Sequence, residues 1–130
     1  MKYLLDTCTL LWFFGDESNL SEKATNVLHN PKASIFISAA SLWEIAIKIN
    51  NQRLKIDFDE LLKEIDRMRF KILSVDAKFL KAIMRIDKKS DFKIHKDPFD
   101  RLLVATAQVE GLTIVTPDKH IQGYEVYTIW

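Results

Sequence analysis

Short apolar runs alternate with longer amphipathic runs along this chain. Three short runs predict buried strands at Tyr3–Leu5, Ser34–Ser38 and Leu112–Thr116. Lys71–Val75 is a candidate strand, and Glu125–Ile129 is expected to form a last strand at an edge of the sheet. This alternation is typical of an α/β domain with a mainly parallel sheet.

The longer runs carry helical periodicity or helix-end signals. Residues 40–50 place Leu42, Ile45 and Ile49 on one side of a helix and Glu44 on the opposite side. Residues 87–96 are polar and are expected to form a loop. The predicted helices are Thr7–Phe14, Ser21–His29, 40–50, Asp57–Met68, Asp76–Ile86 and Asp97–Glu110.

Composition limits the classes of protein that fit. A chain of 130 residues with 48% hydrophobic residues is expected to form one domain. Its 19 basic and 18 acidic residues exclude a charge excess that would bind nucleic acid everywhere. Cys8 is the single cysteine, which suits a reducing cytoplasm, and no apolar run of about 18 residues predicts a membrane span.

Four acidic residues occupy related places in this pattern. Asp6 and Asp118 follow predicted strands, whereas Glu44 and Asp100 lie near the starts of predicted helices. In an open α/β sheet such positions lie at the carboxyl edge of the strands, where these folds bind ligands. The four carboxylates are therefore expected to share one crevice.

Each acid also has an ordinary structural explanation. Asp6 suits a helix N-cap, and Asp118 suits a turn. Glu44 and Lys48 have the spacing of an i, i+4 ion pair on a solvated helix face. Caps accept Ser, Thr, Asn and Asp about equally, so capping alone does not explain an acid at every one of these places.

Crowded carboxylates repel one another, and a divalent cation relieves that repulsion. Oxygen ligands favour Mg²⁺ or Mn²⁺ over zinc, because the three histidines are scattered and Cys8 stands alone. Such an ion can orient and activate a water and stabilise the leaving oxygen in phosphodiester cleavage. The pattern therefore favours hydrolysis of a nucleic-acid strand.

The sequence also resembles the PIN-domain ribonucleases, in particular the toxins of VapC-type toxin–antitoxin pairs. The resemblance lies in LLDTCTLLWFFGD (4–16), SAASLWEIAIKI (38–49), HKDPFDRLLVATAQ (95–108), LTIVTPD (112–118) and the ending YEVYTIW. These stretches cover nearly the whole length in the family's order, and the third is the most specific. The resemblance implies a single PIN-like domain over residues 1–130, with three α/β/α layers and about four to five strands.

Carried over by position, the resemblance gives the catalytic and metal-binding acids as Asp6, Glu44, Asp100 and Asp118. Thr116 matches the family's supporting hydroxyl. Asp97 precedes the ligand position by three residues, so we assign it to the helix N-cap with a supporting role. Cys8 replaces a His found in many relatives and Asn51 replaces a usual Gly, but neither departure removes a carboxylate.

A basic segment precedes and includes the third acid. Lys93, His95, Lys96 and Arg101 are candidates for contacts with substrate phosphates. A solvated loop is the alternative explanation of this segment, and Arg101 could instead bind a neighbouring carboxylate.

The resemblance implies an Mg²⁺- or Mn²⁺-dependent endoribonuclease with an RNA substrate, a cognate antitoxin and a second copy of itself as partners. Trp12, Phe13 and Phe14 span about 200° of a helix, so at least one is expected to meet another chain. Trp43 could belong to the same surface.

Two other functions fit parts of the pattern. A haloacid-dehalogenase-like phosphoryl-transfer enzyme would use Asp6 as nucleophile, but that family has a second Asp where this chain has Cys8. A catalytically silent domain could bind RNA or protein through the same surface, which would leave the acid pattern unexplained.

Overall fold

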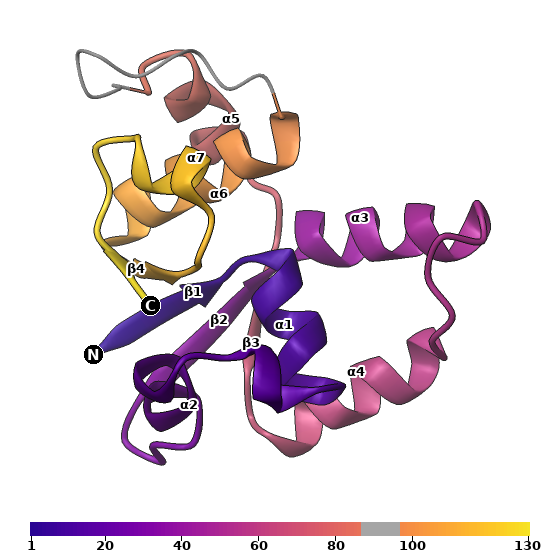
Figure 1. Ribbon diagram of the computed structural model, residues 1–130. Coiled ribbons are helices and arrows are strands. Elements are labelled where there is room, and N and C mark those ends of the chain that lie inside the picture. The colour runs from indigo at the N-terminus through magenta and orange to yellow at the C-terminus, as the bar shows by residue number, and fades with distance from the viewer. Residues whose placement is uncertain (87–96) are drawn as a thin grey trace.

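A parallel β-sheet forms the centre of the computed structural model, which describes residues 1–86 and 97–130 (Figure 1). Its five strands are β1 (Lys2–Leu5), β2 (Ser34–Ser38), β3 (Lys71–Leu73), β4 (Thr113–Val115) and β5 (Thr128–Ile129). Their spatial order is β3-β2-β1-β4-β5, and every neighbouring pair is parallel. The carboxyl end of β1 therefore lies between those of β2 and β4.

Helices form at each of the positions that the sequence predicted. They are α1 (Thr7–Phe14), α2 (Glu22–Leu28), α3 (Ala39–Asn50), α4 (Phe58–Arg67), α5 (Ala77–Ile83) and α6 (Pro98–Glu110). A 3₁₀ turn at Glu17–Asn19 and the short helix α7 (Lys119–Gln122) were not predicted. Figure 1 shows α3 and α4 as a pair that extends away from the sheet.

Side chains of the sheet alternate between two hydrophobic cores, as the pleat requires. Tyr3 and Leu5 pack with α1, α2 and α4, whereas Leu4 packs with α6 and α7. A third cluster joins Ala40 of α3, Phe79 of α5 and Leu102 of α6. The predicted α/β/α layering is therefore confirmed, with each buried leucine contributing about 1.5–3 kcal/mol.

The last predicted strand is shorter than expected. Only Thr128–Ile129 pairs with β4, although the sequence indicated a strand from residue 125. The Gln108 side-chain amide donates to the Glu125 carbonyl at 2.8 Å, and the Val126 amide donates to the Tyr124 carbonyl at 2.9 Å. These bonds bend the chain toward α6 before it can join the sheet.

Two helices are followed by a non-glycine residue in the left-handed region. Gln52 follows α3 with φ 63°, and Arg69 follows α4 with φ 61°. Asn51 has φ −94°, so the usual glycine is not required there. Around Arg69, the Phe70 amide donates to the Ile65 carbonyl at 3.1 Å, which closes a helix end where glycine is the favoured residue.

Replacing Arg69 with glycine should stabilise the protein. The change removes the clash of a Cβ atom in the left-handed region, and a part of that gain is lost because glycine makes the unfolded chain more flexible. We expect Arg69→Gly to raise the free energy of unfolding by about 0.5–1 kcal/mol in urea titrations. Arg69→Ala, which keeps the Cβ atom, is the control, and an Ala variant as stable as the Gly variant would contradict the explanation.

Candidate active site

Asp6 is buried at the carboxyl end of the central strand. Its side chain is the N-cap of α1, with Oδ1 accepting the Thr9 amide at 2.8 Å. The Cys8 sulfur lies 3.3 Å from Oδ1, and the Thr116 hydroxyl donates to Oδ2. Asp6 is 4% exposed, so the expected cap is present, but it is a buried anion whose donors are all neutral.

Thr116 connects Asp6 to Asp118. Its hydroxyl is fully buried, donates to the Asp6 carboxylate and accepts the Asp118 amide at 3.0 Å. Asp118 itself caps α7 by accepting the His120 amide at 2.8 Å. The structure therefore joins the first and last of the four candidate acids through one hydroxyl, which bonds to the Asp6 carboxylate and to the Asp118 backbone amide.

Glu44 lies in a different environment from the one expected. The Thr7 hydroxyl donates to Glu44 Oε1 at 2.6 Å, and Lys48 Nζ lies 3.7 Å from Oε2. The side chain is 19% exposed, so the alternative explanation of a solvated helix face does not describe it, although the i, i+4 pair does form. The wheel of one helix does not reveal that α1 packs beside this part of α3.

Asp100 is in the first turn of α6, which runs back toward the start of β4, so its N-terminus lies at the same edge of the sheet. Asp97 caps this helix as predicted, accepting the Phe99 amide at 2.9 Å. The rings of Trp43 and Phe99, which directly precede Glu44 and Asp100, have centroids 5.2 Å apart. The two helices therefore meet beside these acids.

Of the four residues predicted to contact substrate phosphates, Arg101 is the one that lies within the described residues. Arg101 Nη2 donates to the Ile83 carbonyl at 3.4 Å, which connects the start of α6 to the end of α5. Lys93, His95 and Lys96 lie outside the described residues.

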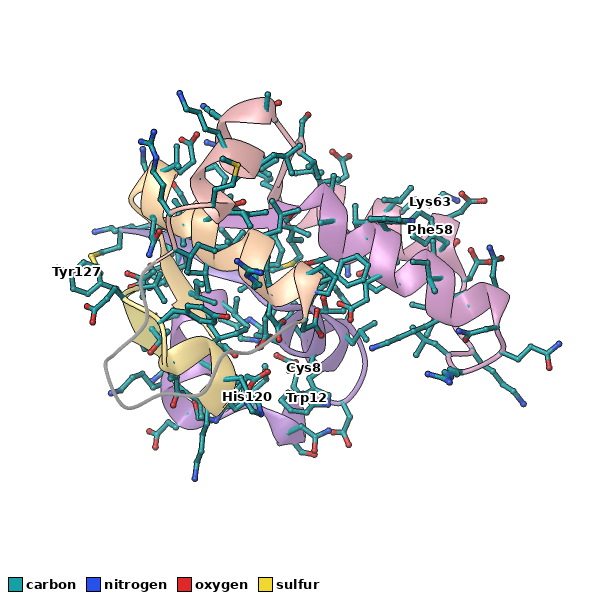
Figure 2. The ribbon with its side chains drawn as sticks, turned by 90° about the horizontal axis from the view of Figure 1, so that it is seen from above. Cys8, Trp12, Phe58, Lys63, His120 and Tyr127 are labelled. Atoms are coloured by element: carbon teal, nitrogen blue, oxygen red, sulfur yellow. The ribbon has the colours of Figure 1, made fainter. Side chains whose placement is uncertain are left out.

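Cys8 is a member of the site that sequence reasoning treated as a local departure. Burial raises the pKa of its thiol to about 12, together with the negative charges of Asp6 and, more weakly, Asp118. Figure 2 shows Cys8 and His120 on one side of the molecule, away from Phe58 and Lys63 of α4. The thiol therefore stays protonated near neutral pH and acts as a hydrogen-bond donor to Asp6.

The donor atoms of the four acids suit a hard divalent cation. No Lys, Arg or His nitrogen of the described residues forms an ion pair with Asp6 or Asp118. A buried carboxylate without a counter-charge is costly, and oxygen ligands are those that Mg²⁺ prefers. In the described ranges, however, no three acidic, Cys or His side chains are already gathered as a metal would require.

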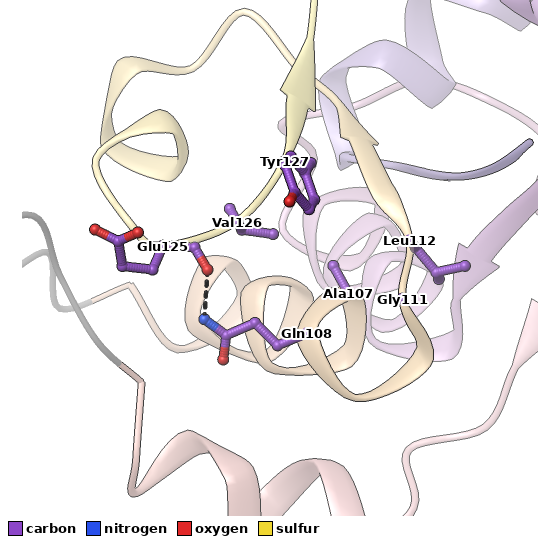
Figure 3. A pocket seen from close by; sticks show the side chains of 7 residues that line it. All are labelled: Ala107, Gln108, Gly111, Leu112, Glu125, Val126 and Tyr127. Atoms are coloured by element: carbon purple, nitrogen blue, oxygen red, sulfur yellow. Dashed lines mark hydrogen bonds between the residues drawn. The ribbon is translucent and has the colours of Figure 1, made fainter.

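A pocket lies away from these acids, between the end of α6 and the segment before β5 (Figure 3). Its volume is about 550 Å³. It is lined by Ala107, Gln108, Gly111, Leu112, Glu125, Val126 and Tyr127. With one carboxylate and no second titratable group except an exposed phenol, it lacks the chemistry found at the ends of β1 and β4.

Comparisons with known proteins agree with this architecture. The sequence profile of the PIN domain matches residues 3–126. A comparison with curated proteins found no significant match. Among the described residues, no helix has the length and apolar character needed to cross a membrane.

Several solved structures are similar over nearly the whole chain. VapBC2 from Rickettsia felis, bound to a promoter DNA fragment, has 17% identity and a TM-score of 0.72, covering 99% of this chain and 98% of the other. FitAcB from Neisseria gonorrhoeae has 18% identity and a TM-score of 0.66, covering 98% and 96%. VapC20 from Mycobacterium tuberculosis, a Sarcin-Ricin loop cleaving toxin, has 14% identity and a TM-score of 0.62, covering 92% of each. At these identities the likeness shows a shared fold.

Alkylation of Cys8 tests the electrostatics of the site. Because its pKa is raised, a smaller fraction of the thiol is ionised at pH 8, and we expect iodoacetamide to react at least about 10-fold more slowly than with an unstructured cysteine peptide. Asp6→Asn removes a negative charge, lowers the thiol pKa and should increase the rate. Asp57→Asn, at the cap of α4, should leave the rate unchanged, and equal rates in all three proteins would contradict the assignment.

Proposed function

This chain belongs to the PIN-domain family, and we propose that it is a divalent-metal-dependent endoribonuclease that serves as the toxin of a toxin–antitoxin pair. The observation that carries the proposal is the buried Asp6 carboxylate, which has neutral donors and a hydroxyl link to Asp118. Such an arrangement keeps a carboxylate at the carboxyl edge of the sheet without an ion-pair partner among the described residues.

Four carboxylates would bind the ion, namely Asp6, Glu44, Asp100 and Asp118. A bound Mg²⁺ or Mn²⁺ supplies positive charge that stabilises phosphodiester oxygens and lowers the pKa of water. Thr116 orients Asp6, and Asp97 caps the helix that presents Asp100. The protein's own contribution is to position these acids from β1, α3, α6 and the end of β4.

RNA is the proposed substrate, for two reasons. VapC20, which shares the fold, cleaves the Sarcin-Ricin loop. In this chain, once the four proposed ligands are set aside, 14 acids remain against 19 basic residues, which suits a polyanion. Lys93, His95, Lys96 and Arg101 are the proposed phosphate contacts, and the Arg101 contact with the Ile83 carbonyl holds this side chain near the start of α6. We expect the reaction to take place in the cytoplasm.

The proposed antitoxin has a suitable surface on α1 and α4. A groove of about 190 Å³ lies there, with Leu11, Phe14 and Leu61 among its apolar walls and Asp57 and Glu60 among its acidic residues. An amphipathic segment with basic residues would complement these walls. VapBC2 and FitAcB are solved as complexes, which supports a partner protein for this chain too.

A second copy of the chain is proposed to pack on α3 and α5. Trp12 packs on Trp130, and Phe13 and Phe14 both contact Phe70, so the chain itself supplies neighbours for these three rings. Trp43 is instead 63% exposed. Ile47 on α3, Leu80 on α5 and Met84 directly after α5 are also exposed, and these apolar side chains are the proposed contributors to a symmetric dimer contact.

Sedimentation velocity tests the dimer. The unmodified protein should sediment as a dimer, and Trp43→Glu as a monomer, because it places a charge in an apolar contact. Tyr127→Glu changes another exposed aromatic residue, which lies outside α3 and α5, and should leave the dimer intact. A monomeric parent protein, or a dimeric Trp43→Glu variant, would reject this surface.

Charge-removing substitutions test the nuclease. Asp6→Asn keeps an N-cap side chain, because Asn caps as well as Asp, but removes the charge needed for metal. We expect cleavage of labelled RNA to fall at least about 100-fold in Asp6→Asn and Asp100→Asn, and to stop in EDTA. Added Mn²⁺ should restore RNA cleavage by the EDTA-treated parent protein.

Asp57→Asn is the matched control, since Asp57 also caps a helix but lies in α4. It should cleave RNA at the parent rate. Full activity of Asp6→Asn, or full activity of the parent protein in EDTA, would refute the proposed function. RNA binding without turnover in the parent protein would instead favour a silent binding domain.

A further inference from the structure

Thr7 is not one of the proposed metal ligands, but its side chain contacts one of them. Its hydroxyl donates to Glu44 Oε1 at 2.6 Å, across 37 residues of sequence, and its side chain is 8% exposed. We infer that Thr7 is a positioning residue that fixes the Glu44 carboxylate for metal binding, an inference that rests on the proposed function.

The place of Thr7 in the fold explains how this bond can position Glu44. Thr7 is the first residue of α1 and directly follows Asp6, whose own carboxylate is fixed by the Thr9 amide and the Thr116 hydroxyl. The Thr7 backbone can therefore move little relative to Asp6. Through its one hydrogen bond, Thr7 therefore fixes the Glu44 carboxylate relative to Asp6.

Glu44 has a competing partner on its own helix. Lys48 Nζ lies 3.7 Å from Oε2, and the Lys48 side chain is half-exposed. An i, i+4 ion pair with an exposed partner is weak, whereas a hydrogen bond to a charged group is several-fold stronger. The buried hydroxyl therefore decides where the carboxylate rests, and without it Glu44 is free to turn toward Lys48 and solvent.

A hydroxyl suits this task better than a cation would. It binds one oxygen of Glu44 and has no charge that would oppose a divalent ion. Groups that hold a metal ligand in place typically change metal affinity or activity by about 10–100-fold when they are removed. Thr7 therefore acts through Glu44 and needs no contact with the substrate.

The test compares Thr7→Val, which removes the hydroxyl at nearly constant shape, with Thr7→Ser, which keeps it. Mn²⁺ alone is titrated into each full-length protein by calorimetry, and RNA cleavage is measured at several Mn²⁺ concentrations. We expect Thr7→Val to weaken Mn²⁺ binding about 10-fold and to regain much of its activity at high Mn²⁺. Thr7→Ser should bind Mn²⁺ within about twofold of the parent protein.

Thr106→Val is the matched control. Thr106 is also buried and donates its hydroxyl, but to the Leu102 carbonyl within α6. Its replacement should leave Mn²⁺ affinity unchanged, and melting temperatures of all variants separate loss of folding from loss of binding. Unchanged Mn²⁺ affinity in Thr7→Val, or equal weakening in Thr7→Ser, would overturn the inference.

Glu44→Gln separates this inference from the proposed function. If Glu44→Gln weakens Mn²⁺ binding and Thr7→Val does not, Thr7 is only a structural residue and the nuclease proposal stands. If the parent protein binds no Mn²⁺, or Glu44→Gln binds it as the parent does, Glu44 is not a ligand and the inference fails together with that part of the proposal.

Discussion

A carboxylate buried at the end of the central strand is the constraint around which this molecule is arranged. Asp6 follows β1, which has a strand on each side, so the chain cannot expose this residue without disturbing the sheet. Burying a carboxylate is costly, and the structure offsets a part of that cost with the Thr9 amide of α1 and the hydroxyl of Thr116. Elements distant in sequence are thereby required to meet at one point.

Capping and metal binding are not rival explanations of these acids. At the junction of a strand and a following helix, exposed amides and the helix dipole both favour an anion. In a parallel sheet, all such junctions lie at one edge. Asp6 and Asp118 each cap a helix. The Thr116 hydroxyl also connects them, because it donates to the Asp6 carboxylate and accepts the Asp118 amide. The geometry that makes Asp a good cap is also the geometry that would collect carboxylates for the proposed cation.

The local patterns predicted the sheet and its helices because each buried strand is nearly continuous in apolar residues and each long helix has an end signal. They failed where a contact from another element decides the outcome. The chain at residues 125–126 bends because Gln108 binds the Glu125 carbonyl, which periodicity does not record. For Glu44, a helical wheel alone allowed a solvated face as an alternative, because it contains no α1. The pairing of Thr7 with Glu44 could have been suspected only from a fold that already set β1 beside β2.

The donors around Asp6 and Glu44 share a chemical character that is compatible with binding a cation. An arginine or lysine beside Asp6 would stabilise the empty site and compete with a divalent ion for the same oxygens. Threonine hydroxyls, backbone amides and the Cys8 thiol can orient a carboxylate while leaving its charge intact. Without a counter-charge the site is less stable than a neutralised one would be, and under the proposed function that difference would add to the affinity for a cation. Lys48, at the margin and partly exposed, is the exception, because its ammonium lies 3.7 Å from Glu44 Oε2 while the Thr7 hydroxyl donates to Oε1.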